Sequence, residues 1–292
     1  MPVPQFETYR PSGRFHIPAT GIAFGVALVA GLVVGGIYGA LEAVNPLIYF
    51  TIIGTFFLGI GLGFVDTKLV TFARIRAPWL GVVLALWTAF WGIYGSWMGW
   101  MSTFLWQVDE AMFVWDPITL VSLMMLVMEQ GAWEIKGHTP TGMELQAIWA
   151  IEALIIVGAA VWTAFGQARE PYCEVSGAWY ELEYENILLE AMDADSVKRA
   201  CANGDLTAIA ARPITGLDEL LVAKLQVGQG PPEVGALTFE KVVITVDKNG
   251  KKQEKRTTVV RQMVVRDDLL QKARAMPYEA EQARSQPSEL EV

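Results

Sequence analysis

The fold of this chain is decided first by residues 17–44, which read IPATGIAFGVALVAGLVVGGIYGALEAV. Only Thr20, Tyr38 and Glu42 interrupt this apolar run. A helix needs about 20 apolar residues to cross roughly 30 Å of hydrocarbon. The run is also far longer than the apolar core of a signal peptide, which has about 7–15 residues. The segment therefore predicts a retained transmembrane helix.

Three further segments, at 47–65, 79–101 and 147–166, are apolar over a comparable length. Residues 112–129 differ from them, because their apolar stretch from Ile118 to Met128 is too short to cross a bilayer. This stretch predicts an amphipathic helix on the outer surface or a re-entrant segment. Residues 1–166 are thus predicted to form an all-α membrane domain of four transmembrane helices.

The overall composition agrees with a membrane protein and excludes several other classes. Of the 292 residues, 53% are hydrophobic and 18% are charged, against about 25% charged in an ordinary soluble domain. The net charge of −9 is the wrong sign for a nucleic-acid-binding surface. Two cysteines and two histidines leave few ligands for a metal site, so no metal or other cofactor is expected.

The distribution of basic residues predicts the orientation. Lys and Arg concentrate on the cytoplasmic side of transmembrane segments. The loop from residue 102 to 146 contains only Lys136, whereas five basic residues flank the other ends of the first three spans: Arg10, Arg14, Lys68, Arg74 and Arg76. We therefore expect both termini in the cytoplasm of a cell membrane, either a plasma membrane or a bacterial inner membrane. A fifth span would place the C-terminal half outside, which these charges disfavour.

Glycines recur at every fourth position in three of the spans. Such spacing lines one face of a helix and lets two backbones approach closely. The pattern predicts either packing within one four-helix bundle or a homo-oligomer interface. The residues concerned are Gly31, Gly35, Gly39, Gly59, Gly63, Gly95 and Gly99.

Glu152 lies about five residues inside the fourth span. Ionisable groups inside a membrane are costly and are therefore candidates for function. One interpretation is an ion or proton site at Glu152. The other is a structural carboxyl group on the same side of the membrane as Glu42, solvated through the bundle end or hydrogen-bonded to Tyr49, Tyr94 or Trp149. Asp66 is interpreted as a solvated helix end.

Residues 167–276 have a water-soluble composition and predict a cytoplasmic α+β domain. A helix is expected from Asp193 or Asp195 to Gly204, a second from 215 to about 225 and a third from 267 to 276. Strands are expected at 236–246 and 252–265, because Asn249–Gly250 between them is a strong hairpin signal. Residues 277–292 are rich in Pro, Glu, Gln and Ser and predict a disordered tail.

Two features of this domain bear on binding. Cys173-Glu-Val-Ser176-Gly resembles half of a zinc knuckle, but Ser176 replaces the second cysteine and zinc needs four ligands. Basic residues gather at the predicted hairpin tip, which predicts a solvated turn or a contact with anionic lipid heads or an acidic partner. They are Lys248, Lys251, Lys252, Lys255 and Arg256.

The sequence lacks the motifs that assemble catalytic sites, including Walker A, GxSxG, HExxH and paired CxxC. We therefore expect a non-enzymatic membrane anchor or complex subunit that presents a cytoplasmic interaction domain. A two-stranded hairpin is marginal alone and needs helix cover or a partner strand. The expected partners are the lipid bilayer and either a protein or further copies of the chain, and not nucleic acid. The alternative is a small oligomeric channel or transporter with Glu152 in its pathway.

Overall fold

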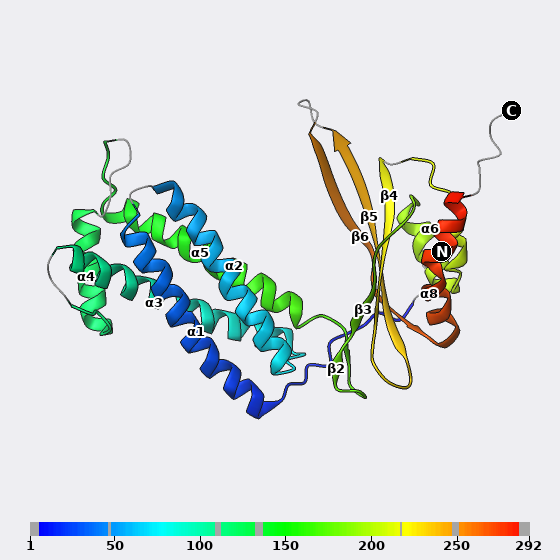
Figure 1. The fold of residues 1–292 in the computed structure, drawn as a ribbon, viewed down its shortest axis with the longest axis horizontal. Helices are drawn as coiled ribbons and strands as arrows, with labels where there is room; N and C mark the ends of the chain where they lie inside the picture. The colour runs from blue at the N-terminus through cyan, green and yellow to red at the C-terminus, as the bar shows by residue number, and fades with distance from the viewer. Residues whose placement is uncertain are drawn as a thin grey trace. The chain divides into compact units, whose positions relative to one another are not determined.

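The computed structural model divides the chain into two compact units, one of Pro11–Arg169 and one of Met1–Arg10 with Glu170–Val292. The structure describes residues 6–45, 48–108, 112–131, 137–216, 218–246 and 251–285. Four long apolar helices are followed by a small α+β region, as the sequence predicts (Figure 1). We describe each unit by itself.

The first unit is a bundle of five helices. Its elements are α1 (Ile17–Ala43), α2 (Ile48–Phe72), α3 (Pro78–Gln107), α4 (Pro117–Gln130) and α5 (Gly142–Gln167). By length and composition, α1, α2, α3 and α5 can each cross a membrane, and α4 is too short to do so. Helix α4 lies at one end of the bundle (Figure 1). Its amphipathic or re-entrant placement stays a prediction.

The helix starts follow the expected local chemistry, with one exception. Asp116 caps α4, because its carboxylate accepts a hydrogen bond of 2.7 Å from the backbone N–H of Thr119. Helix α5 begins at Gly142, directly after Thr141, where Thr141-x-x-Glu144 matches the capping-box pattern of a helix start. However, the Thr141 side chain makes no cap hydrogen bond. The Glu144 carboxylate lies 2.8 Å from His138 Nε2 instead.

Glycines bring the helix backbones of this unit into contact. A Cβ atom at Gly35 or Gly39 of α1 would lie within 2.0 Å or 1.9 Å of a backbone oxygen of α3. At Gly95 and Gly99 of α3 it would lie 2.6 Å and 2.1 Å from backbone oxygens of α1. On α2, a Cβ atom at Gly59 or Gly63 would instead meet side-chain atoms of α5, Ala159 Cβ at 3.0 Å and Thr163 Oγ1 at 2.3 Å. The α1–α3 and α2–α5 contacts therefore depend on glycine.

The second unit is an antiparallel sheet with helices on one face (Figure 1). Strand order is β3-β4-β5-β6. The strands are β3 (Glu181–Glu190), β4 (Glu219–Val227), β5 (Val234–Val246) and β6 (Lys252–Arg266). The helices are α6 (Ala194–Asn203), α7 (Thr207–Ala210) and α8 (Asp267–Ser285), and a small hairpin joins β1 (Tyr172–Cys173) to β2 (Ala178–Trp179). The predicted strand pair is present as β5 and β6, while its turn at 247–250 lies outside the described residues.

The helix predicted at 215–225 is wrong, because residues 219–227 form the interior strand β4. Leu221 and Leu225 pack into the core beneath the helices, and Leu220 and Val222 pack against Val242 on the other face. A strand buried on both faces loses the alternation that distinguishes it from a helix. The hairpin therefore has a partner strand, β4, within its own chain, and β3 extends the sheet beyond it.

Two of the predicted helices are present. Asp193 caps α6 through Ser196 N–H at 2.9 Å, and Gly204 ends it in the left-handed conformation, as predicted. Burial raises the pKa of the Cys201 thiol on this helix to about 12. Helix α8 continues to Ser285, past the predicted end at Met276. The predicted disordered tail is therefore wrong for 277–285, where Ala280 packs into the core, while 286–292 lie outside the described residues.

Candidate functional site

The first unit contains a cavity lined by side chains from all five helices. Its volume is about 60 Å³, enough for a few water molecules or a small cation. Glu42 of α1 and Glu152 of α5, both half-buried, face this cavity from opposite helices. The other lining residues are Tyr38, Thr55, Ile93, Ser96, Trp97, Trp100, Val127, Trp149, Ala153 and Ile156.

The structure thus brings the predicted residue Glu152 together with Glu42. The two carboxyl groups are close enough to interact electrostatically. No Lys, Arg or His side chain is found among the described residues that line the cavity. Repulsion between two carboxylates in a poorly solvated site is relieved when a cation or a proton lies between them. The arrangement is therefore suited to holding a cation or a proton.

A chain of hydroxyl groups leads away from the two acids. The Tyr38 hydroxyl lies 3.1 Å from Thr55 Oγ1, and Thr55 donates a hydrogen bond of 2.9 Å to the Thr51 carbonyl oxygen. Either hydroxyl group can be the donor in the Tyr38–Thr55 contact, because Tyr38 also has the Thr51 carbonyl oxygen as an acceptor at 3.5 Å. Glu42 interacts with Tyr38 and Thr51 at the head of the chain. Gly54 leaves room for the Tyr38 ring, which would lie 2.8 Å from a Cβ there.

The opposite wall of the cavity is aromatic. Trp97 and Trp149 meet edge to face with ring centroids 4.6 Å apart, and Trp97 makes a similar contact with Trp100 at 6.1 Å. Tyr94 does not bond to Glu152, because its hydroxyl donates to the Trp115 carbonyl oxygen at 2.6 Å. The side chain of Tyr49, another predicted partner, lies outside the described residues. An aromatic wall opposite carboxylates favours cations over anions.

Sequence reasoning missed Tyr38, Thr55 and Ser96 as members of this site. A signal for Tyr38 exists, because it precedes Glu42 by four residues and so lies on the same helical face. Thr55 and Ser96 carry no comparable signal, since single hydroxyl residues are common in transmembrane helices. Only the packing of α2 and α3 against α1 places them beside the acids.

The interpretation of Asp66 as a solvated helix end is wrong. Helix α2 continues for six residues beyond it, and Asp66 has no exposed surface. Thr88 of α3 lies 2.6 Å from one carboxyl oxygen, and the other oxygen has no hydrogen-bond partner. Thr88 also lies 3.0 Å from the Leu84 carbonyl oxygen. Asp66 therefore joins α2 to α3 inside the bundle.

The predicted basic cluster is described in part. Lys251, Lys252, Lys255 and Arg256 are exposed on or beside β6, whereas Lys248 lies outside the described residues. Arg256 is engaged by carboxylates of its own domain, with Nε 2.5 Å from Glu254 and a guanidinium nitrogen 3.7 Å from Glu240. The hydrogen bond that its guanidinium donates to Glu254 raises the pKa of Arg256. Arg256 is therefore held by carboxylates of the sheet. The exposed lysines are the remaining described residues of the cluster.

The N-terminal segment pairs with the same strand. Thr8 forms an antiparallel bridge with Met263 of β6. Tyr9 N–H donates to the Gln262 carbonyl oxygen and Val264 N–H donates to the Glu7 carbonyl oxygen, both at 2.8 Å. Glu7 also forms an ion pair of 3.3 Å with Arg266. Residues from the two ends of the chain are thus part of one folded unit.

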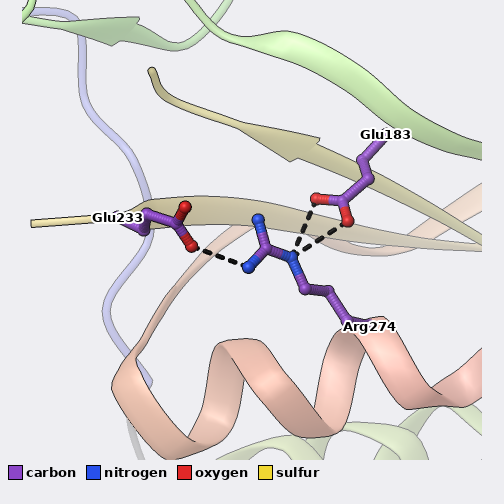
Figure 2. A network of polar contacts seen from close by, with 3 residues as sticks. All are labelled: Glu183, Glu233 and Arg274. Atoms are coloured by element: carbon purple, nitrogen blue, oxygen red, sulfur yellow. Dashed lines mark hydrogen bonds and ion pairs between the residues drawn. The ribbon is translucent and has the colours of Figure 1, made fainter. Parts of the chain in front are cut away.

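The remaining polar features of this unit are structural. Figure 2 shows Arg274 of α8 between Glu183 of β3 and Glu233, which precedes β5, with nitrogen–oxygen distances of 2.6–3.1 Å. The Cys173–Gly177 segment makes a tight turn, with Ser176 N–H donating to Cys173 Sγ at 3.4 Å. No group of three or more His, Cys, Asp or Glu side chains gathers at a possible metal site in the part of the chain that the structure describes.

Comparison with known proteins adds no relative to this description. No family model matches the chain, and neither a curated protein nor a solved structure is significantly similar to it. Two features of the molecule itself bear on function: the cavity with two carboxyl groups and the sheet edge that receives the N-terminal segment.

Proposed function

We propose that this protein is a non-enzymatic membrane anchor or complex subunit, which holds its α+β domain at the cytoplasmic face and presents it to a protein partner. The observation that carries the proposal is the pairing of residues 7–9 with β6. Residues before α1 and residues after α5 belong to one unit, which supports a placement of both on the same side of a membrane. This supports an even number of spans and disfavours the five-span alternative.

The connections between the domain and the helices support an anchoring role. Seven residues separate the bound Tyr9 from the start of α1, and four residues separate the end of α5 from β1. At about 3.3–3.6 Å per extended residue, these linkers are short. Linkers of this length would keep the domain near a bilayer that the helices span. Such double tethering suits a module that works on a partner at the membrane surface.

Cysteine labelling tests the proposed orientation. Met143 at the start of α5 and Val175 in the β1–β2 turn are both highly exposed, at 85% and 77%. In a background without the native cysteines, we expect an impermeant maleimide to label Met143→Cys in intact cells and Val175→Cys only after lysis. The reverse pattern, or labelling of both in intact cells, would contradict the cytoplasmic location of the domain.

Removal of residues 170–292 tests the partner-binding role. After crosslinking in native membranes, the full chain is expected to purify with a reproducible protein partner that the truncated chain lacks. The truncated chain must still insert and run as a single species in detergent, which is the control. Unchanged interactions after truncation would show that the domain is not the binding module.

The second candidate function is a small channel or transporter, which the meeting of Glu42 and Glu152 in one cavity favours. Its weakness is the small number of other polar side chains in the spans, since conduction pathways usually contain several. We would measure cation flux into liposomes for the full chain and for Glu152→Gln. The control is Glu144→Gln on the same helix, because Glu144 is exposed and bonds to His138 away from the cavity. Flux that Glu152→Gln leaves unaltered would contradict this function.

A further inference from the structure

The outer edge of β6 is occupied over only part of its length. Residues 7–9 pair with 262–264, but no described residue forms backbone hydrogen bonds along the outer side of Lys252–Thr258. These seven residues keep an uninterrupted register with β5 from Lys252↔Val246 to Thr258↔Glu240. All of them are exposed. An edge strand of this kind can receive a further strand through its backbone N–H and C=O groups.

The occupied part of the edge shows what this strand accepts. There it binds an extended segment in antiparallel orientation, and the acidic residue Glu7 pairs with the basic residue Arg266. After Arg10 the N-terminal segment leaves β6 and leads to α1. The open part of the edge, Lys252–Thr258, lies farther along β6 in the direction in which this segment was running. Register shifts near Val260 separate the two parts, and Gln262 has a positive φ of 49°. The N-terminal segment therefore cannot extend along Lys252–Thr258.

The charge of the open part selects the kind of occupant. It carries three basic residues and the single acidic residue Glu254. Arg256 is engaged by Glu254 and Glu240, which leaves the exposed Lys252 and Lys255 as the charges a partner would meet. Like charges on directly opposite strands are destabilising, so two β6 edges would repel each other. An acidic strand would be attracted.

The acidic edge strand of a second copy suits this position less well. Strand β3 carries Glu181, Glu183 and Glu185, but register shifts on both sides of Tyr184 and the positive φ of Asn186 interrupt it. Bulges of this kind blunt a sheet edge against pairing. In addition, Glu183 is bound to Arg274 of its own domain. The open part of β6 therefore suits an acidic strand from a different protein.

We propose that the outer edge of β6 between Lys252 and Thr258 binds an extended acidic segment of a partner protein, which adds to the sheet as a further strand. This proposal rests on the proposed function, because it states which kind of partner the α+β domain would bind. Backbone hydrogen bonds would provide most of the affinity, and Lys252 and Lys255 would select acidic side chains.

The test uses the full chain in detergent and a fluorescein-labelled peptide, Thr-Glu-Val-Val-Glu-Val-Thr, whose two Glu side chains lie on opposite faces of an added strand, as Lys252 and Lys255 do on β6. Fluorescence anisotropy is expected to show saturable binding, and amide hydrogen exchange at 252–258 is expected to slow. Lys252→Glu with Lys255→Glu should weaken binding about fivefold or more, since two attractive pairs become repulsive. The matched control, Lys198→Glu with Lys272→Glu, makes the same charge change on α6 and α8 and should leave binding unchanged.

Two further peptides separate strand addition from simple charge attraction. A version with alternate backbone nitrogens methylated cannot donate the strand hydrogen bonds and should lose binding. A version with Lys in place of Glu should not bind. Absence of saturable binding, equal loss in the control variant, or full binding of the methylated peptide would overturn the proposal. An oligomer of the full chain that the Lys252/Lys255 variant dissociates would also overturn it, since the occupant would then be a second copy.

A failure of strand addition at β6 can be told apart from a failure of the proposed function. If a protein partner is lost on removal of residues 170–292 but is retained by the Lys252/Lys255 variant, the domain still binds a partner and this edge is not the binding surface. If the truncation also leaves the interactions unchanged, the proposed function itself fails.

Discussion

The two units of this protein achieve close packing in opposite ways. In the unit of Pro11–Arg169, called the membrane unit because four of its helices are long and apolar enough to cross a membrane, α1 and α3 meet through glycines. The absent side chains let backbone atoms of the two helices touch. In the α+β unit, large side chains such as Phe239, Leu221 and Leu237 fill the space between the sheet and its helices with no exposed surface. The bilayer provides no hydrophobic drive between helices, so contact area must come from close approach. In water, burial of apolar side chains provides the drive.

This contrast predicts that removing volume harms the α+β unit most. Phe239→Ala should destabilise it by about 3–5 kcal/mol, because a cavity remains where the ring was. Hydrogen exchange on the full chain resolves the two units separately, and the loss of protection should be confined to β3–β6 and α6–α8. Phe239→Leu is the milder control, and equal effects of the two variants would argue against a tightly packed core.

Adding volume should harm the membrane unit most. Gly35→Ala places a Cβ about 2.0 Å from the Gly92 carbonyl oxygen, so α1 and α3 must move apart. We expect a loss of about 1–3 kcal/mol, measured as a lower melting temperature in detergent. Gly25→Ala adds the same methyl group to the same helix where no atom lies within 4 Å, and it should be neutral or slightly stabilising. Similar melting temperatures for both variants would contradict glycine-dependent packing.

A polar contact inside the membrane unit should have a smaller effect. Thr88→Val keeps the shape of the side chain but leaves the buried Asp66 carboxyl group without its partner, which should cost about 1 kcal/mol. Thr88→Ser keeps the hydroxyl and should retain most of the stability. If Val and Ser behave alike in detergent melting, the contact is not stabilising.

The smallest expected effect is at the surface of the α+β unit. Arg274→Gln removes the ion pairs to Glu183 and Glu233, which are worth about 0.5–1 kcal/mol because all three side chains are partly exposed. The difference from the unaltered chain should shrink at high salt, since ions screen exposed charges. A salt-independent loss measured by hydrogen exchange of α8 would instead point to packing of the arginine stem.

The sequence predicted those elements whose signals are local. The four apolar helices, α6 between Asp193 and Gly204, and the paired strands β5 and β6 each follow from length, capping residues or turn chemistry. It failed at β4 and at the end of α8. Strand β4 is buried on both faces and so lacks a strand pattern, while α8 continues through Pro277 because Ala280 packs into the core.

The candidate sites divide in the same way. The sequence by itself identified Glu152 as an acid inside a span and the lysines of β6 as a basic cluster, because charge and hydropathy are properties of the chain. Only the tertiary structure placed Glu42, Tyr38 and Thr55 around Glu152, buried Asp66 against Thr88, and joined residues 7–9 to β6. These are contacts between segments far apart in the chain, and they depend on how helices and strands pack rather than on any local preference.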